Sequence, residues 1–144
     1  MTRAFLIGAL ATGATLFATP TLAEEFRCTG AVGPVSLDNV FVPDGASCVL
    51  DRTRMNGSVV VGRGPSLQAT SVSINGNLQS ESHTSAISAT GNIIGGNLQA
   101  FQNMGGASFI NNRMNGNMQC KENIPAPTGS GNQSPSKEDQ CAGL

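Results

Sequence analysis

The 144-residue sequence contains no tryptophan and no tyrosine, and it has a single histidine, His83. Sugar binding by ring stacking normally uses Trp or Tyr, so this kind of site is not expected. Charge is also scarce: charged residues make up 12% of the chain, and Glu81 is the only one between Gly64 and Asn112. The chain therefore has no basic stripe, which argues against a nucleic-acid partner.

The sequence also has no cluster of residues suited to catalysis or metal binding. Parallel β-helix lyases and hydrolases need carboxylates grouped on one face, or a basic residue beside an acidic Ca²⁺ site. Glu81 and His83 could share one strand face, but a lone acid and a lone histidine on a surface strand are usually solvent-exposed. No Cys-x-x-Cys motif points to zinc. We expect a non-enzymatic protein without a metal or cofactor.

The first 23 residues have the pattern of a secretory signal peptide. Arg3 supplies a positive charge, residues 4–18 are apolar or small, and residues 21–23 place small side chains at a cleavage site before Glu24. The run is shorter than the roughly 20 apolar residues of a membrane span. We predict an exported chain, secreted or periplasmic, with no membrane span after cleavage.

A motif recurs every twenty residues in the middle of the chain. Residues 74–79 read Ile-Asn-Gly-Asn-Leu-Gln, residues 94–99 Ile-Gly-Gly-Asn-Leu-Gln, and residues 114–119 Met-Asn-Gly-Asn-Met-Gln. Weaker copies occupy residues 55–60 and 37–40. A fixed period with atypical end copies indicates a repeat protein, and no helical periodicity accompanies it. We predict an all-β fold: a short parallel β-helix (β-solenoid) of about 4–5 coils near 20 residues each.

The alternative is an antiparallel sheet in which the Asn-Gly pairs form hairpin turns. Hairpins would turn about every 8–12 residues rather than every twenty, so the solenoid is favoured. The hexapeptide rhythm typical of left-handed solenoids is missing, which favours a right-handed coil.

Three sets of repeated positions are the candidate functional residues. Stacked coils would place one set of amides at about the 4.8 Å strand spacing, where they can hydrogen-bond along the stack: Asn77, Asn97 and Asn117. A second, outward ladder is predicted at Gln79, Gln99 and Gln119. Corners that need positive φ or close backbone approach are predicted at Gly76, Gly96 and Gly116.

Two further patterns concern the core and a second possible face. The apolar pairs Ile87 with Ala107 and Ala89 with Phe109 alternate small and large at the period, which fits a narrow core. The threonines do not align at the period, so an ice-binding threonine ladder is not predicted.

Four cysteines in an exported chain favour disulfides, because that compartment is oxidising. We prefer Cys28 with Cys48 and Cys120 with Cys141 among the three possible pairings. Residues one coil apart stack in a solenoid of this period, so both pairs come within bridging range. Each bridge would stabilise the fold by roughly 3 kcal/mol in the chain-entropy model.

The chain divides into four predicted segments. They are a signal peptide (1–23), an N-terminal cap with a first degenerate coil (24–54), the solenoid repeats (55–124), and a Pro/Gly/Ser-rich C-terminal tail and cap (125–144). The prolines after Ile124 stop the pattern, because proline cannot donate to a ladder. Residues 130–140 are predicted to be extended or loosely ordered.

The Gly-Asn-(Leu/Met)-Gln repeats, with Cys-Lys-Glu-Asn at 120–123, Pro-Ala-Pro-Thr-Gly at 125–129 and Gln-Cys at 140–141, resemble small uncharacterised secreted proteins of Gram-negative bacteria. This resemblance covers most of the mature chain and implies no activity. The short coils are distantly similar to bactofilins, which implies a solenoid fold. The Asn/Gln/Gly repeat resembles that of curlins, which implies a self-assembling amyloid subunit.

We expect an exported, non-enzymatic protein of the cell envelope or exterior with a structural or interaction role through its polar ladder faces. Its partner would be a second copy, an envelope polymer or another protein. Two other functions stay open. One is a curlin-like self-assembling subunit, and the other is a β-helix protein that binds or cleaves a polysaccharide.

Overall fold

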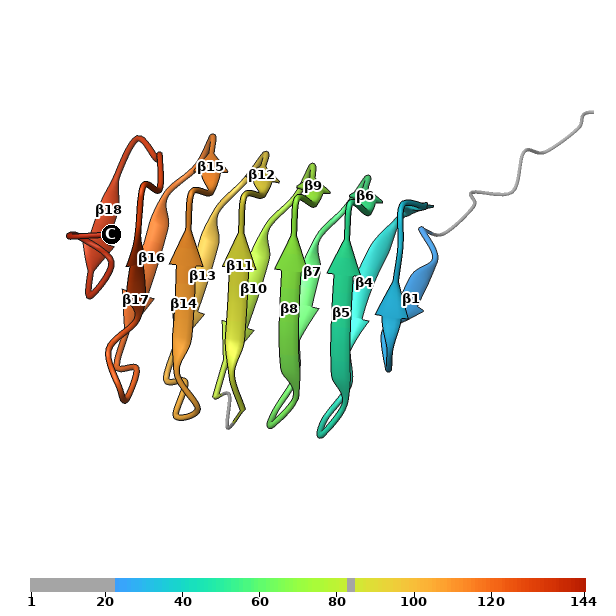
Figure 1. Ribbon diagram of the computed structural model, residues 1–144, viewed down its shortest axis with the longest axis horizontal. Coiled ribbons are helices and arrows are strands. Elements are labelled where there is room, and N and C mark those ends of the chain that lie inside the picture. The colour runs from blue at the N-terminus through green and yellow to red at the C-terminus, as the bar shows by residue number, and fades with distance from the viewer. Residues whose placement is uncertain (1–22, 83–84) are drawn as a thin grey trace, which may run out of the picture.

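The computed structural model describes residues 23–82 and 85–144. Its regular elements are short β-strands, and the described residues contain no helix. The strands form three parallel sheets, A, B and C, and the chain coils through them in about five turns (Figure 1). The prediction of an all-β parallel solenoid is confirmed.

The strands of the described residues fall into the three sheets as follows. Sheet A consists of β1 (Glu25–Arg27), β4 (Asn39–Val42), β7 (Val59–Val61), β10 (Leu78–Glu81), β13 (Leu98–Phe101), β16 (Met118–Lys121) and β18 (Lys137–Asp139). Sheet B consists of β2 (Ala31–Val32), β5 (Ser47–Asp51), β8 (Ser66–Thr70), β11 (Ile87–Thr90), β14 (Ala107–Ile110) and β17 (Thr128–Ser130). Sheet C consists of β3 (Ser36–Leu37), β6 (Arg54–Met55), β9 (Ser73–Ile74), β12 (Ile93–Ile94) and β15 (Arg113–Met114).

Each coil passes through sheets A, B and C in that order. In Figure 1 the strands of sheet B run upward in front, those of sheet A run downward behind, and the chain advances from right to left. This path is a right-handed coil, the usual hand for parallel crossovers.

The twenty-residue period of the sequence appears in the structure as the spacing between paired residues on neighbouring strands. Leu78 pairs with Leu98 and Leu98 with Met118, each twenty residues on, while Val59 pairs with Leu78 at nineteen. All four side chains point inward and are buried. Because side chains alternate between the two faces of a strand, the same repeat places Gln79 and its copies outward.

The core is a narrow column of apolar side chains inside the coil. Ala89 pairs with Phe109 and Ile87 with Ala107, so small and large residues alternate between neighbouring coils, as the sequence predicted. Phe109 is the largest of the fully buried side chains. Burying a side chain of this class contributes about 1.5–3 kcal/mol relative to leaving it exposed.

A disulfide closes each end of the solenoid, in the predicted pairing. Cys28 bonds to Cys48, with 5.5 Å between their Cα atoms, and Cys120 bonds to Cys141, with 5.2 Å. All four cysteines are buried. The prediction of disulfide-closed ends is confirmed.

The C-terminal segment forms a further coil. Residues 130–140 were expected to be extended or loosely ordered, and the expectation of loose order is wrong. Strand β17 extends sheet B, and β18 extends sheet A beside β16. The segment is polar, but Asn132 and Gln140 take inward positions and are held there by hydrogen bonds. Hydrogen-bonded amides thus replace the apolar burial that sequence reasoning looked for.

The predicted signal peptide falls almost entirely on residues 1–22, outside the described residues. Across the part of the chain that the structure describes, no helix has the length and apolar character needed to cross a membrane.

Candidate functional site: the amide ladders

The predicted glutamine ladder runs along the outer face of sheet A. Gln79 Nε2 donates to Gln99 Oε1 at 2.8 Å, and Gln99 Nε2 donates to Gln119 Oε1 at 2.9 Å. Gln119 Nε2 then donates to Glu138 Oε2 at 2.8 Å. A carboxylate has acceptors only, so this ladder, whose donors all point toward the C-terminal end, stops at Glu138. The glutamines are half-buried, which leaves one edge of each amide open to solvent.

The asparagines of the Gly-Asn motif stack at the corner between sheets C and A. Asn77 Oδ1 accepts from the backbone N–H of Asn97 at 2.8 Å, and Asn97 Oδ1 accepts from that of Asn117 at 2.8 Å. Hydrogen bonds between the side-chain amides themselves were expected along this stack. Here each amide instead bonds the backbone of the next coil, because that N–H needs a partner at the corner.

The glycines of the motif provide room for these asparagines. A Cβ on Gly96 would lie 2.1 Å from Asn77 Oδ1, and one on Gly116 would lie 2.1 Å from Asn97 Oδ1. For Gly76 the nearest atom is Ser58 Oγ, at 2.3 Å. Glycine was predicted here either for positive φ or for close backbone approach. The short distances to the hypothetical Cβ atoms show that close approach is the reason. Glycine and asparagine recur together because the glycine of one coil accommodates the asparagine of the coil before it.

Positive φ occurs at a different place, just after the strands. Directly after strands of sheet B it is found at Arg52, Ser71, Gly91, Asn111 and Gly131. This left-handed residue turns the chain so that the next side chain also points inward. In three coils that next residue is an asparagine.

Sequence reasoning missed the ladder that these inward asparagines form. Asn92 Nδ2 donates to Asn112 Oδ1 at 2.9 Å, and Asn112 Nδ2 donates to Asn132 Oδ1 at 2.9 Å. The second Nδ2 hydrogen bonds a carbonyl of sheet B, that of Ala69 for Asn92 and that of Ala89 for Asn112. All three asparagines are at most 4% exposed. Their twenty-residue spacing was visible in the sequence and is the signal that could have found them.

A second buried ladder lies at the corner between sheets A and B. Asn103 Nδ2 donates to Asn123 Oδ1 at 2.8 Å, and Asn123 Nδ2 donates to Gln140 Oε1 at 2.9 Å. Asn123 Nδ2 also donates to the carbonyl of Ala100 at 2.8 Å. Buried amides cost free energy when unpaired, so a ladder with these partners fixes the relative position of the coils.

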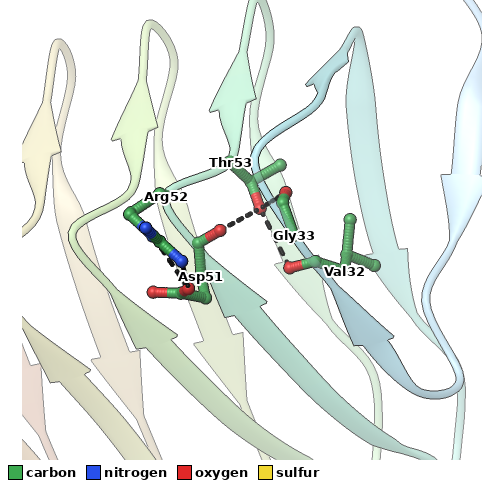
Figure 2. Close-up of polar contacts among 5 residues, drawn as sticks. All are labelled: Val32, Gly33, Asp51, Arg52 and Thr53. Atoms are coloured by element: carbon green, nitrogen blue, oxygen red, sulfur yellow. Dashed lines mark hydrogen bonds and ion pairs between the residues drawn. The ribbon is translucent and has the colours of Figure 1, made fainter.

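At the N-terminal end, Thr53 takes the place of the inward asparagine (Figure 2). Its side chain is fully buried, and its Oγ1 donates to the Gly33 carbonyl at 2.9 Å, with the Val32 carbonyl at 3.3 Å. On the outer side of the same corner, Arg52 and Asp51 form an ion pair at 2.9 Å. This pair is largely exposed and contributes little to stability.

Of the two residues considered for catalysis, the structure describes Glu81. Glu81 is exposed, beside a shallow hollow lined by Phe101, Gln102, Lys121 and Glu122. His83 lies outside the described residues. Within residues 23–82 and 85–144, no group of three or more His, Cys, Asp or Glu could hold a metal ion. What the repeated positions present is a set of fixed amides.

Comparisons of the chain with models of protein families, with curated proteins and with solved structures find no match. The solenoid arrangement is consistent with the resemblance to short-coil solenoids. The resemblances to secreted Gram-negative proteins and to curlins rest on the sequence motifs alone.

Proposed function

We propose that the mature chain is an exported structural or interaction protein of the cell envelope or exterior, and that it is not an enzyme. Its contact surface is the glutamine ladder of sheet A, Gln79, Gln99 and Gln119. The observation that carries the proposal is the pair of amide–amide hydrogen bonds along this ladder, at 2.8 and 2.9 Å. They hold a neutral row of amides in one orientation. Binding a partner therefore does not cost the conformational entropy of ordering these side chains.

The two buried disulfides support export. Structural disulfides persist in secreted and periplasmic proteins and are rare in the cytosol. Here they join coils at both ends of the solenoid. Together with the predicted signal peptide, they favour a secreted or periplasmic location.

The partner class that fits best is an envelope polymer that presents hydroxyl and peptide groups, or the strand edge of another protein. An amide offers one donor and one acceptor at the same edge, which matches hydroxyl groups and peptide groups alike. Among the described strands β1 is the edge of sheet A and pairs with β4, so a partner's strand could also add to its other side.

Co-sedimentation of the purified mature protein with peptidoglycan sacculi and with whole envelopes tests the proposal. We expect the wild type to sediment with one of these fractions. The triple variant Gln79→Ser, Gln99→Ser, Gln119→Ser should stay in the supernatant. Gln133→Ser, which changes an exposed glutamine outside the ladder, is the matched control and should sediment like the wild type. Equal sedimentation of the triple variant, or none by the wild type, would reject the proposal.

A curlin-like self-assembling subunit is the second candidate, and stacked amide ladders favour it because similar ladders stabilise amyloid. The C-terminal end favours the structural or interaction protein. The glutamine ladder ends there in the Glu138 carboxylate, which cannot donate a hydrogen bond to a further subunit. Thioflavin fluorescence and detergent resistance separate the two. We expect neither signal from the oxidised mature protein, and fibres positive for both would replace our proposal with the curlin-like one.

A polysaccharide-binding or polysaccharide-cleaving role is the third candidate, based on the hollow beside Glu81 and Glu122. An activity assay on a panel of polysaccharides tests it with Glu81→Gln as the comparison. Cleavage by the wild type that disappears in Glu81→Gln would show an enzyme.

A further inference from the structure

The N-terminal end of the solenoid leaves apolar core positions open. Phe26 of β1 pairs with the buried Val40, so it is the first member of the inward column of sheet A. Among the described residues no further coil covers it, and its side chain is 38% exposed. Leu37 of β3 is the first member in sheet C and is only half-buried. Both side chains line a hollow at this end, so the core lacks a cover there.

The C-terminal end, on the left in Figure 1, is covered instead. Residues 140–143 form turns after β18, and Cys141 among them is buried and bonded to Cys120. The last member of the inward column of sheet A is Lys137, whose ammonium group donates to the Leu144 carbonyl. A partner that covers apolar surface is therefore expected at the N-terminal end.

Strand β1 also has a free edge among the described strands. The Glu24 carbonyl and the Cys28 N–H both bond to β4, at 3.2 and 2.9 Å. In a strand that pairs on one side, backbone groups of alternate residues point to the other side. The N–H and C=O groups of Glu25 and Arg27 therefore face away from β4, where a further strand can bond to them.

The three residues of β1 are complementary to themselves when two copies run antiparallel. Phe26 then lies opposite Phe26 of the second copy, and Glu25 lies opposite Arg27 on either side of it. Glu25 and Arg27 form the hydrogen-bonded pairs, and the phenylalanines form the non-hydrogen-bonded pair, in which side chains come closest. Opposite charges that face each other across two strands stabilise the pairing.

The two charges of β1 are exposed and form no ion pair within the described residues. Arg27 is held beside the edge, because its guanidinium carbon lies 5.2 Å from the centroid of the Phe41 ring. In the predicted mature chain only Glu24 precedes β1. Its nitrogen donates to Asp38 Oδ2 at 3.4 Å, which keeps it alongside β4 and off the edge.

We propose that two copies of the mature chain form a symmetric dimer through their N-terminal ends, with β1 pairing antiparallel to β1 of the second copy. Sheet A then continues from one copy into the other, and each Phe26 is covered by its counterpart. A two-fold interface of this kind is closed, because both copies use the same surface. The covered C-terminal ends point away from each other.

Head-to-tail stacking is the alternative use of the same edge. It would place β1 beside β18 of another copy, with Arg27 near Glu138 and Phe26 near Lys137. Both oxygens of Glu138 already accept hydrogen bonds from amides of the preceding coil, and Lys137 would set a charge against an aromatic core residue. The antiparallel arrangement pairs apolar with apolar and each charge with its opposite, so it is favoured.

Sedimentation equilibrium of the oxidised mature protein tests the inference. We expect twice the mass of the chain, without larger species at higher concentration. Arg27→Glu sets glutamates opposite each other, and Glu25→Arg sets arginines opposite each other. Each variant alone should raise the dissociation constant of the dimer by about tenfold or more. Arg113→Glu, the same charge reversal at an exposed position of β15, should dimerise like the wild type.

Two restored pairings control for loss of folding. An equimolar mixture of the Arg27→Glu and Glu25→Arg variants brings the glutamates of one chain against the arginines of the other, so a dimer should form again. The double variant that carries both substitutions should also dimerise, because its exchanged charges remain self-complementary. Thermal unfolding of each variant verifies that it is folded.

Four results would overturn the inference: a monomeric wild type, a mass that keeps rising with concentration, undiminished dimerisation by both single variants, or no dimer in their mixture. A monomeric wild type would leave the edge to a strand of another protein, and a rising mass would show head-to-tail stacking. The inference does not rest on the proposed function, because the glutamine triple variant should remain dimeric. A dimer that fails to sediment with sacculi or envelopes would reject the proposed function alone.

Discussion

Glu138 accepts a hydrogen bond from Gln119 at 2.8 Å, at the point where the glutamine ladder reaches the last coil. Its other oxygen accepts from Asn117 Nδ2 at 2.9 Å, so one carboxylate ends both outer ladders. Solenoid ends expose strand edges that invite association. A carboxylate has no hydrogen-bond donor, so it cannot extend the ladders into a further coil. The end of this solenoid is therefore closed by side-chain chemistry as well as by a disulfide.

Glu138→Ala should destabilise the protein by about 1–2 kcal/mol. It leaves the amides of Gln119 and Asn117 without their acceptor, but both are half-buried, so water replaces part of the loss. Urea unfolding of the oxidised mature protein measures the change. Glu81→Ala, an exposed glutamate on β10 of the same sheet, is the control, and an equal effect of the two substitutions would contradict the role given to Glu138.

Asn112→Ala should cost more, about 3 kcal/mol. It removes the middle of the buried ladder: one Nδ2 hydrogen and the backbone N–H of Asn92 lose their acceptor, and the Ala89 carbonyl loses a donor. Asn115→Ala, in the same coil but exposed, should change stability by less than about 0.5 kcal/mol. Similar midpoints for these two variants in urea would refute the ladder's contribution.

Gly96→Ala should destabilise by about 1–3 kcal/mol, because the new methyl group meets Asn77 Oδ1 at 2.1 Å and the Gly76 carbonyl at 3.0 Å. Combining it with Asn77→Gly should recover part of the loss, since the side-chain clash is then gone. A double-mutant cycle measures this coupling. Strictly additive effects would show that the glycine and the asparagine do not depend on each other.

The period and the disulfide pairing could be predicted because each follows from spacing alone. Leu78, Leu98 and Met118 repeat as apolar residues, and such a column is readable without knowing the fold. Asn92, Asn112 and Asn132 repeat just as regularly, but asparagine ordinarily indicates a solvated turn. Their burial depends on the left-handed residue before each of them, which sequence reasoning did not locate.

The alignment of Thr70 with Thr90, against the expectation for the threonines, was missed because Asp51 and Ile110 occupy the equivalent positions in the adjacent coils. The polar C-terminal coil was likewise expected to be loose, because it offers few apolar residues to bury. In the buried asparagine ladders and in the C-terminal coil, hydrogen bonds between coils take the place of apolar contacts, and these bonds depend on the register.

Removing the Cys120–Cys141 bridge by a double serine substitution should destabilise the last coil first, by roughly 3 kcal/mol. Hydrogen exchange should then accelerate in β17 and β18 while β8 and β11 stay protected. The double serine variant of Cys28 and Cys48 is the mirror control and should loosen β1 and β2 instead. Uniform acceleration along the whole chain in both variants would contradict end-specific closure.

The central claim is that this solenoid works outside the cytoplasm as an oxidised, processed chain. Intact-mass spectrometry of the protein recovered from the periplasm, envelope and medium of a Gram-negative host tests it most directly. The account predicts a chain that begins at Glu24 and lacks the four hydrogens of its cysteine thiols. Recovery mainly from the cytoplasm, with Met1 or Thr2 at the N-terminus and four free thiols, would contradict it.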